Sequence, residues 1–500
     1  MNLARNLESA ALYFPDHPAL REEGSEISYA RLNDRANRVA TALIGLGLQP
    51  GEHVALCAPN SADWITFYFG VLKAGAVAVT LSSLLAEKEL ALLVNHARPR
   101  FVFSTDDKRN VLEGLQSGCG IERLICSGGD LNLGGLIDRG SGTFRALDRD
   151  RADTAAVLYT GGTTDTPKGV MLTQEGMNFS SQTTVYCERS TEADQALCFM
   201  PFNHVFGQIH ILNATILSCG CLEILPGFDL DRIVEAIAAG RITKFYAVPT
   251  VYIRLLSLPD LEKKLGKLRY CFSAAASMAR EIVKQWKERT GITIAESYGM
   301  TEGMPVTYNH YYPERHRVGS VGTLVQGVEV QIRDTAGKRL ETGQEGEICV
   351  RGRNVMKGYL NNPEGTRGAF WEGEWLRSGD IGVLDDDGYL YLVDRLKDMV
   401  ITGGENVYPR EVEEVLYQHP AVEECAVIGL PDPEWGERVT AFVVPKPGET
   451  LDSEALKDFL KSRLSSFKVP KEYISVEKLP KSPAGKLLKR ELRETLSKKK

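Results

Sequence analysis

Hydrophobic positions in the first hundred residues alternate between a helical and a strand period. In residues 28–48 apolar side chains recur every three or four positions, which predicts an amphipathic helix with Ser28 as its N-cap. The predicted buried face of this helix consists of Leu32, Ala36, Val39, Ala40 and Leu43. Short apolar strands are predicted at 53–58, 76–81 and 100–105, with helices at 64–73 and 87–97 between them. This alternation indicates a mostly parallel sheet with helices on both faces.

The same pattern returns in the middle of the chain and then changes. Buried strand runs at 221–225, 244–249 and 268–277 each end in small or turn-prone residues. In open parallel sheets ligands lie at the carboxyl ends of strands, so we expect the site at these endings. From about residue 318 to 396, short strands separated by Gly-Asp turns predict antiparallel structure.

A small α+β unit is predicted at the C-terminal end of the chain. It contains a helix at 409–420, strands at 422–431 and 437–445, and Lys-rich helical segments. A chain of 500 residues exceeds what one hydrophobic core usually organises. The sequence therefore predicts an N-terminal domain over 1–395 and a C-terminal domain over 396–500.

Composition and charge narrow the class of protein. Hydrophobic residues make up 43% and charged residues 25%, as in ordinary soluble globular chains. The net charge of -7 and the lack of a basic stripe argue against a nucleic-acid partner. Glu8 interrupts the N-terminus too early for a signal peptide, and the most apolar window, 67–81, carries Lys73 in its middle. We therefore expect no stable membrane insertion.

Cysteine spacing points to a reduced compartment. The ten cysteines include no Cys-x-x-Cys pair, and Cys219 and Cys221 are expected to be plain packing residues. The interpretation is a cytoplasmic protein without structural zinc.

The loop "YTGGTTDTPKGV", residues 159–170, has the composition of a polyphosphate site. Glycines let a backbone approach a ligand, threonines supply hydroxyl groups, and Lys168 supplies a point charge. The spacing is not that of a Walker loop, because Lys168 is followed by Gly169 and by a predicted strand instead of a helix.

Four other segments carry candidate chemistry, although each alone has a common structural explanation. A single histidine is more often a packing residue, a Tyr-Gly turn or an exposed lysine is ordinary, and "DDDG" lacks the distal Glu of a calcium loop. Their joint occurrence in one order is the stronger signal. The segments are "FNHVFGQ" with His204, "ESYGMTEG" with Glu302, "SGDIGVLDDDGYLYLVDRLKD" with Asp380, and "LPKSPAGKLLKR" with Lys486.

Together with the phosphate loop, these segments resemble the adenylate-forming superfamily, which includes acyl-CoA synthetases, aryl-CoA ligases, firefly-type luciferases and peptide-synthetase adenylation domains. The resemblance covers residues 12–492. It implies an α/β fold: a large N-terminal domain of two α/β subdomains plus a β-barrel, with a small mobile α+β lid. It also implies that ATP and CoA are co-substrates and that Mg²⁺ is a cofactor.

The resemblance assigns ATP contacts residue by residue. Tyr298 would stack on adenine, Asp380 and Arg395 would hold the ribose, Thr301 would contact the α-phosphate, and Glu302 would bind Mg²⁺. The β- and γ-phosphates would be held by Thr160, Gly162, Thr163, Thr164 and Lys168. The remaining ATP-binding positions are Ala275, Ala276, Glu296 and Ser297.

Two positions in the phosphate loop depart from the family pattern. Gly161 replaces a common Ser, and Asp165 stands where Gly is usual. A carboxylate 4 Å from a phosphate charge costs about 1 kcal/mol in a water-like dielectric and more if buried. The sequence leaves open whether Asp165 repels the triphosphate, faces solvent or helps to hold magnesium.

The C-terminal residues imply a two-step mechanism by resemblance. Lys486 would bridge the substrate carboxylate and the α-phosphate while an acyl-adenylate forms and pyrophosphate leaves. The lid would then rotate about Lys397, and Gly403 and Gly404 would line the tunnel through which CoA reaches the adenylate. The CoA thiolate then displaces AMP, and catalysis is mainly positioning and charge neutralisation.

Two residue types that are absent from the predicted acid pocket narrow the range of acid substrates. Gly299 stands where acetate-type synthetases place a Trp, and Ser297 stands where malonate-type ligases place an Arg. The predicted acid is therefore uncharged and medium-sized: aromatic, alicyclic or medium-chain. Its contacts would come from His204, Phe206, Tyr246, Ala274 and Gly299.

Two alternatives to an acid–CoA ligase stay open at this point. One is an adenylating enzyme that loads a separate acyl-carrier protein, and the other is a nucleotide-binding homologue without ligase activity. The physiological direction is also open, because both steps are reversible and the enzyme could run towards ATP. We expect a monomer or a homodimer.

Overall fold

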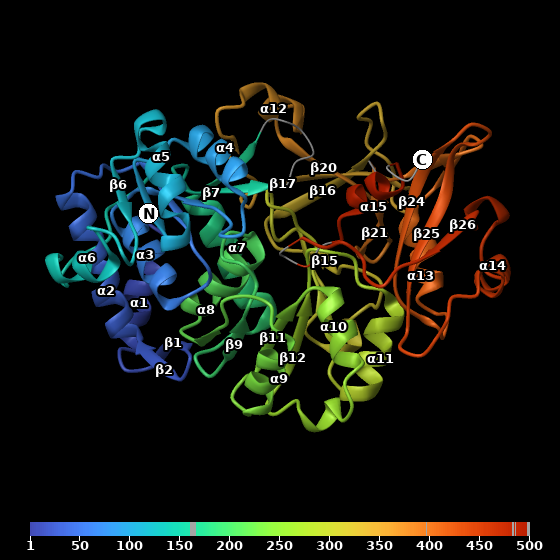
Figure 1. Ribbon diagram of the computed structural model, residues 1–500, viewed down its shortest axis with the longest axis horizontal. Coiled ribbons are helices and arrows are strands. Elements are labelled where there is room, and N and C mark those ends of the chain that lie inside the picture. The colour runs from blue at the N-terminus through green and yellow to red at the C-terminus, as the bar shows by residue number, and fades with distance from the viewer. Residues whose placement is uncertain (161–166, 397, 483–484, 486, 498–500) are drawn as a thin grey trace.

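The computed structural model describes residues 1–160, 167–396, 398–482, 485 and 487–497. The predictions for Gly161, Gly162, Thr163, Thr164, Asp165, Lys397 and Lys486 lie outside these residues. In Figure 1 the N-terminal elements lie at the left, the middle of the chain lies at the centre, and the C-terminal elements lie at the right.

The first sheet follows the predicted alternation of strands and helices. Among the described residues it has seven strands, in the order β18 (Gly358–Tyr359), β8 (Lys168–Thr173), β7 (Thr154–Thr160), β4 (Val77–Thr80), β3 (His53–Cys57), β5 (Phe101–Ser104) and β6 (Arg123–Ile125). β7, β4, β3, β5 and β6 pair in parallel. β8 is the strand that the sequence predicted after the candidate phosphate loop. It runs antiparallel to β7, so this loop connects the two strands of a hairpin.

The second sheet is parallel except for its outermost strand. The described residues place seven strands in it, in the order β13 (Ile294–Glu296), β12 (Tyr270–Ser273), β11 (Lys244–Ala247), β9 (Gln195–Cys198), β10 (Cys221–Ile224), β1 (Pro18–Glu22) and β2 (Ser25–Ser28). The predicted strand at 268–277 is shorter in the structure, where β12 ends at Ser273 and a bend follows.

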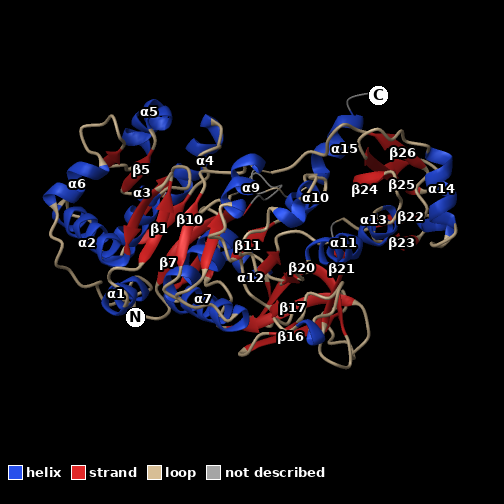
Figure 2. Ribbon diagram, turned by 90° about the horizontal axis from the view of Figure 1, so that it is seen from below, coloured by secondary structure: helices blue, strands red, loops and turns tan. Residues whose placement is uncertain are grey.

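Helices cover both sheets (Figure 2). Those of the first hundred and forty residues are α1 (Arg5–Tyr13), α2 (Tyr29–Gly45), α3 (Ala62–Lys73), α4 (Glu87–Ala97), α5 (Arg109–Cys119) and α6 (Leu133–Arg139). Those of the middle are α7 (Gln174–Glu188), the π-helix η2 (Phe206–Asn213), α8 (Ala214–Leu217), α9 (Leu230–Ala238), α10 (Pro249–Leu256) and α11 (Arg280–Thr290).

Helix α2 confirms the hydrophobic pattern. Ser28 accepts a hydrogen bond from the backbone N–H of Arg31, as an N-cap does. All five predicted face residues are fully buried in a core that spans both sheets.

Glu8 and Lys73, the two charges that broke the apolar segments, form an ion pair. Lys73 Nζ lies 2.6 Å from Glu8 Oε1, and Lys73 is fully buried. The apolar window around Lys73 divides between α3 and β4, and within the described chain no helix combines the length and apolar character needed to cross a bilayer. The charged lysine is therefore accommodated by a partner inside the fold.

An antiparallel region follows, as predicted. Its described strands are β14 (Thr307–Tyr308), β15 (Thr323–Leu324), β16 (Val328–Arg333), β17 (Gly346–Gly352), β19 (Phe370–Trp371), β20 (Trp375–Leu384) and β21 (Leu390–Arg395). The short helix α12 (Pro363–Gly368) precedes β19.

The C-terminal small domain has its own sheet and its own hydrophobic core. Figure 2 shows it at one end of the molecule, beside α10 and α11. Its described elements are β22 (Val400–Thr402), β23 (Glu405–Val407), α13 (Pro409–Leu416), β24 (Val422–Asp432), β25 (Gly436–Pro445), α14 (Ser453–Lys461), β26 (Glu472–Ser475) and α15 (Lys489–Ser497). The domain boundary at 395/396 stays a prediction.

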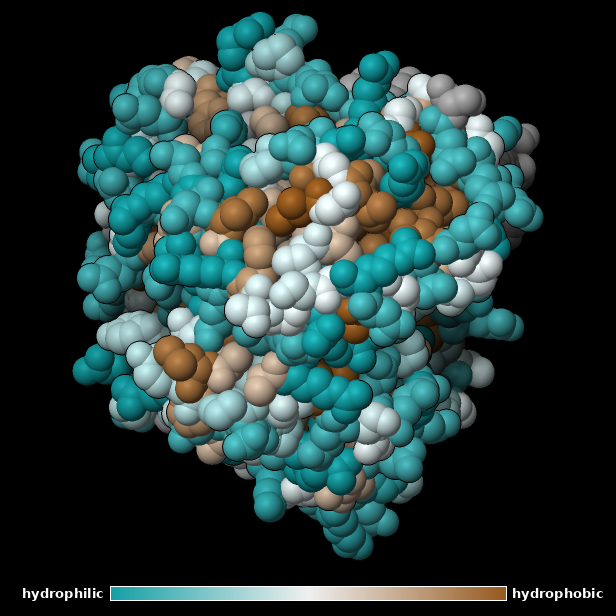
Figure 3. Space-filling model, turned by 90° about the vertical axis from the view of Figure 1, so that its left-hand side faces the viewer, coloured by the Kyte–Doolittle hydropathy of each residue, from teal (hydrophilic) through white to brown (hydrophobic). Residues whose placement is uncertain are grey.

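The opposite end of the molecule, formed by the N-terminal elements, has a mixed surface. Figure 3 shows that hydrophobic residues gather there in one band within a largely hydrophilic surface.

Candidate active site

The carboxyl ends of four neighbouring parallel strands lead directly to predicted site residues. The segment after β9 carries His204 and Phe206, β11 leads to Val248, β12 leads to Ala274, and β13 leads to the turn 297–302. Because these strands are adjacent in one sheet, their ends meet at one edge. The structure thus brings together segments that are up to a hundred residues apart.

The turn after β13 is tied to the antiparallel region through one tyrosine. Tyr298 donates a hydrogen bond of 2.7 Å to Asp380 Oδ2. Asp380 also lies 3.3 Å from Arg395 Nε, its cross-strand partner on β21. Burial raises the pKa of Tyr298 well above its usual value, and the nearby Asp380 adds to this rise, so the hydroxyl keeps its proton. The predicted adenine and ribose residues therefore form one connected group.

Thr301 and Glu302 lie at the tip of a tight turn. Met300 and Gly303 exchange backbone hydrogen bonds of 3.1 and 3.0 Å and close the turn. The backbone N–H of Met356 donates to the Glu302 carbonyl at 2.8 Å, which anchors the turn to the antiparallel region.

Lys168 and Glu302 meet at Tyr359. The Tyr359 hydroxyl donates to Glu302 Oε1 at 2.9 Å, and Lys168 Nζ lies 5.4 Å from the centre of the Tyr359 ring. Thr160 is the cross-strand partner of Lys168, so both ends of the candidate phosphate loop lie at this place. A lysine and a carboxylate side by side suit a magnesium–polyphosphate ligand.

The acidic side chain fits Mg²⁺ as a single carboxylate ligand. The described residues contain no group of three His, Cys, Asp or Glu side chains with metal-binding geometry. Mg²⁺ is commonly held by one or two carboxylates together with substrate phosphates. Glu302, at the turn tip beside Lys168, has the chemistry for that role.

Phe206 and Tyr246 belong to a buried cluster of rings, which we call the ring cluster. Its members are Phe206, His210, Tyr246, Phe272 and Tyr308. The centroid of the His210 ring lies 4.3 Å from that of Phe272 and 5.3 Å from that of Phe206. His210 and Tyr308 stack at an interplanar angle of 9°.

Glu188, the last residue of α7, holds the polar ends of the ring cluster. Its carboxylate accepts hydrogen bonds from Tyr246 at 2.5 Å, from Tyr308 at 2.6 Å and from Lys244 at 3.1 Å, and it contacts His210 Nε2 at 2.9 Å. Burial opposes ionisation of Glu188, but the Lys244 charge and the hydrogen bonds outweigh it and lower its pKa to about 2. The ring cluster therefore has little freedom to move.

Lys244 is already neutralised by acidic partners. Besides Glu188 it lies 3.7 Å from Asp194, which is also paired with Arg269. The positive charge beside the ring cluster is therefore compensated within the protein.

The segment after β12 contains a strained alanine. Ala275 has a φ of +69°, in the left-handed region where a Cβ costs about 1 kcal/mol. Such positions are a natural place for glycine, which has no Cβ to strain the backbone. Ala274 is half-buried and Ala276 is exposed.

Gly299 lies in close contact with Met304. A Cβ at Gly299 would lie 2.7 Å from Met304 Cβ, so a larger residue does not fit without a shift. Met304 therefore occupies the space next to Gly299, where a side chain at position 299 would lie. Ser297 donates a 2.6 Å hydrogen bond to the Thr307 carbonyl, which directs it to β14.

Glu296 is buried at the end of β13. Burial raises its pKa to about 8, because the nearby Arg410 and Arg280 charges offset only part of the cost. Its Oε2 atom is buried without a hydrogen-bond partner among the described residues. Near neutral pH this carboxyl group is protonated.

The C-terminal domain contacts the site edge through Gly485. A Cβ on Gly485 would lie 2.6 Å from Val248 Cγ2, so Gly485 lies against the segment after β11. Gly403 and Gly404 form the β22–β23 turn with φ of +60° and +85°, and Gly403 donates to the Trp435 carbonyl at 2.8 Å. The orientation described here thus places Gly485, the neighbour of the predicted Lys486, at the large domain.

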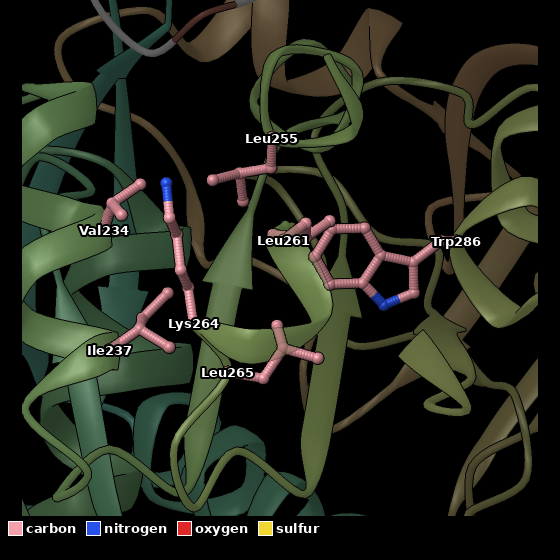
Figure 4. Close-up of a pocket in the computed structure, with 7 residues that line it drawn as sticks. All are labelled: Val234, Ile237, Leu255, Leu261, Lys264, Leu265 and Trp286. Atoms are coloured by element: carbon pink, nitrogen blue, oxygen red, sulfur yellow. The ribbon is translucent and has the colours of Figure 1, made fainter. Parts of the chain in front are cut away.

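A separate apolar pocket lies away from these residues. Figure 4 shows it between α9, α10 and α11, lined by Val234, Ile237, Leu255, Leu261, Lys264, Leu265 and Trp286. None of the predicted site residues lines it, so we assign it to helix packing.

Several residues of the site escaped the sequence analysis. His210 was overlooked although it lies within an apolar run, and Lys244 stood as a single charge at the start of a buried strand. These polar residues within apolar runs were the available signal. Nothing local marked Tyr359 or Tyr308, because their partners lie far away in the sequence.

Known proteins share both the sequence and the architecture. The "AMP-binding enzyme" family matches residues 7–360, and the "AMP-binding enzyme C-terminal domain" matches residues 411–486. The chain is 33% identical to a long-chain-fatty-acid–CoA ligase of Bacillus subtilis over 98% of this chain and 93% of that protein. It is 34% identical to a feruloyl-CoA synthase of an Amycolatopsis species over 96% of each.

A solved structure aligns over almost the full length. The anthranilate CoA ligase AuaEII in complex with anthranoyl-AMP superimposes with a TM-score of 0.94 at 30% identity, covering 100% of this chain and 98% of that one.

Proposed function

The chain belongs to the AMP-binding enzyme family and is an AMP-forming acid–CoA ligase, and we propose that it activates an uncharged acid of medium size with a single ring. ATP, CoA and a carboxylic acid are its substrates, and Mg²⁺ is the usual partner of the nucleotide. Loading of a separate acyl-carrier protein is not favoured, because the similar proteins are CoA ligases.

The ring cluster is the observation that supports the choice of acid. Phe206, Tyr246 and Phe272 come from the strand ends where the carboxylate is to be activated. Flat aromatic walls favour a ring substrate through offset or edge-to-face contacts. The hydrogen bonds of Glu188 hold Tyr246, and His210 and Tyr308 pack against Phe272 beside it, which disfavours a long flexible chain that needs an extended channel.

Charge compensation argues against a second carboxylate on the acid. A distal carboxylate in a buried pocket needs an uncompensated cation. Lys244, the buried cation beside the ring cluster, is engaged by Glu188 and Asp194. The names of two similar proteins, a feruloyl-CoA synthase and an anthranilate CoA ligase, also support an aromatic acid.

The proposed nucleotide contacts follow the geometry of the turn and strands. Tyr298 stacks on adenine, Asp380 accepts from the ribose hydroxyls, and Arg395 fixes Asp380. Thr301 contacts the α-phosphate. Thr160 and Lys168, with the loop between them, hold the terminal phosphates. Bound at Glu302, Mg²⁺ would neutralise phosphate charge.

The proposed reaction proceeds in two steps. The acid carboxylate attacks the α-phosphorus and pyrophosphate leaves, with Lys486 offsetting the negative charge of both groups. The C-terminal lid, residues 396–500, then turns about Lys397, and the CoA thiolate attacks the acyl carbon and releases AMP. Gly403 and Gly404 line the CoA path in this second orientation.

The test is AMP release with MgATP and CoA against a panel of acids. The panel contains benzoate, cyclohexanecarboxylate, coumarate, hexanoate, octanoate, palmitate, acetate and malonate. We expect the highest kcat/KM with a single-ring acid. A preference for palmitate or malonate would overturn the proposed substrate class, and the absence of both AMP release and pyrophosphate exchange would overturn the activity.

Location and assembly belong to the same proposal. We place the enzyme in the cytoplasm as a monomer or homodimer, which cell fractionation and sedimentation measure directly.

A further inference from the structure

Two helices that meet at the domain contact lack N-caps of their own. Ala279 precedes α11 and Tyr408 precedes α13, and neither side chain accepts a hydrogen bond from its helix. The first amide groups of a helix have no partner within the helix, and a Ser, Thr, Asp or Asn side chain usually supplies one. Elsewhere in the chain Asp229 and Asp452 do so for α9 and α14.

Each of the two helices receives its acceptor from the other domain. Asp394 Oδ2, on β21, accepts a hydrogen bond of 2.8 Å from the backbone N–H of Arg410, the second residue of α13. Glu414 Oε2, on α13, accepts one of 3.1 Å from the backbone N–H of Arg280, the first residue of α11. A carboxylate at a helix N-terminus also interacts favourably with the helix dipole.

The two caps run in opposite directions across one contact. Figures 1 and 2 both show α11 and α13 side by side at the junction of the two domains. Asp394 precedes the predicted hinge at residue 397, and Arg410 follows it. Because the partners lie on opposite sides of this hinge, rotation of the small domain separates both pairs.

A partly buried lysine, Lys489, connects α13 to the start of α15. Lys489 Nζ lies 2.8 Å from Glu413 Oε1 on α13. Burial raises the pKa of Asp394, and the charge of Lys489 opposes that rise. Arg410 additionally donates from Nη1 to the Leu392 carbonyl at 2.7 Å. The start of α15, three residues after Lys486, is thus fixed near β21 in the orientation that places Gly485 against Val248.

We propose that Asp394 and Glu414 are positioning residues for the first half-reaction. Their reciprocal caps hold the small domain in the orientation that delivers the Lys486 turn to the acid and the α-phosphate. Both caps are released when the domain turns for thioester formation. The inference rests on the proposed two-step function, and neither carboxylate touches a substrate.

The test measures the two half-reactions separately in Asp394→Ala, Asp394→Asn, Glu414→Ala and Glu414→Gln. Adenylation is followed by ATP–pyrophosphate exchange, and the second step is followed by thioester formation from presynthesised acyl-adenylate. Loss of one cap should shift the equilibrium between the two orientations of the small domain about fivefold. We expect each Ala variant to slow exchange about fivefold and to leave the second step unchanged or faster.

The conservative variants and a matched control separate positioning from stability. Asn is as good an N-cap as Asp, and Gln keeps an acceptor oxygen, so Asp394→Asn and Glu414→Gln should retain most of the exchange activity. Asp452→Ala removes a cap of the same chemistry within the small domain, where its acceptor oxygen serves Glu454 and Ala455 of the same helix. It should leave the ratio of the two half-reactions unchanged.

A readout independent of activity completes the test. In Asp394→Ala, backbone hydrogen exchange of a peptide covering 409–416 should accelerate without any ligand. Equal slowing of both half-reactions would overturn the proposal. Unchanged ATP–pyrophosphate exchange in both Ala variants would also overturn it. If the unaltered enzyme forms no acyl-adenylate, the proposed function fails, and unchanged hydrogen exchange in Asp394→Ala then refutes the caps separately.

Discussion

Tyr298 and Asp380 lie 82 residues apart in the sequence, yet the tyrosine hydroxyl donates a 2.7 Å hydrogen bond to the aspartate. This bond joins the turn after β13 to strand β20. It couples the two parts of the site to which we assign the adenine ring and the ribose.

Removing the Tyr298 hydroxyl should weaken ATP binding without affecting CoA. A hydrogen bond to a charged group contributes about 1.5–3 kcal/mol, so we expect Tyr298→Phe to raise the KM for ATP about tenfold or more. Steady-state kinetics with ATP and with CoA as the varied substrate measure this. An equal rise in the KM for CoA would contradict the assignment.

Lys486→Ala should abolish adenylation and spare thioester formation from presynthesised acyl-adenylate. The lysine is assigned to only one of the two orientations of the small domain. Lys481→Ala is the matched control, because Lys481 belongs to the same turn region but is paired with Glu424 at 2.7 Å. Equal loss of both half-reactions in Lys486→Ala would refute the two-orientation mechanism.

Lys397→Pro should have the opposite effect, sparing adenylation and slowing thioester formation. Proline restricts the backbone φ to about -65°, which should block rotation of the lid while the adenylating orientation remains accessible. We expect ATP–pyrophosphate exchange to persist and AMP release with CoA to fall at least tenfold. A normal second step would count against residue 397 as the hinge.

Glu188→Leu should destabilise the protein strongly. Removal of one partner of a buried ion pair costs about 3–5 kcal/mol. Without Glu188 the buried Lys244 keeps only the more distant carboxylate of Asp194, which it shares with Arg269. Asp63→Asn, at the more exposed pair with Arg35, should cost about 1 kcal/mol or less. Urea unfolding of both variants provides the comparison, and similar losses would contradict the role given to Glu188.

The low pKa of Glu188 also predicts that the stability of the folded protein depends on pH in the acid range. Its folded value of about 2 lies below the ordinary value of 4.5, so its contribution is present above pH 4.5 and is lost as the pH falls towards 2. The stability difference between the unaltered protein and Glu188→Leu should shrink over that range.

Glu296 should make the folded protein less stable as the pH rises, which is opposite to the effect of Glu188. Glu296→Gln should remove this pH dependence of stability. The folded pKa of about 8 exceeds the ordinary value of 4.5, so the folded protein keeps a proton that the unfolded chain releases. This contribution is present below pH 4.5 and is lost as the pH rises through 8. Thermal melting between pH 6 and 9 should show Glu296→Gln gaining stability relative to the unaltered protein, and parallel curves would refute the raised pKa.

Much of the fold was predictable because its signals are local. The helical period and the Ser28 cap identified α2, and strand lengths with short connections identified the parallel sheets. The strand after Lys168 distinguished the hairpin loop from a Walker loop. The candidate site residues come from motif resemblance, and their roles stay predictions. The structure places His204, Phe206, Ala274 and the turn 297–302 after neighbouring strands, where the strand-end rule expects a ligand.

The sequence alone determined the order of helices and strands, the division into a large and a small domain, and the residue types available for binding a nucleotide. These follow from periodicity, turn residues and motifs within about twenty positions. Only the tertiary structure decided that Glu188 joins Lys244, Tyr246 and Tyr308, and that Asp394 and Glu414 cap helices of the opposite domain. Such pairs depend on how buried faces pack. Because the hydrophobic effect that drives this packing is not directional, the local sequence does not specify which distant polar groups will meet.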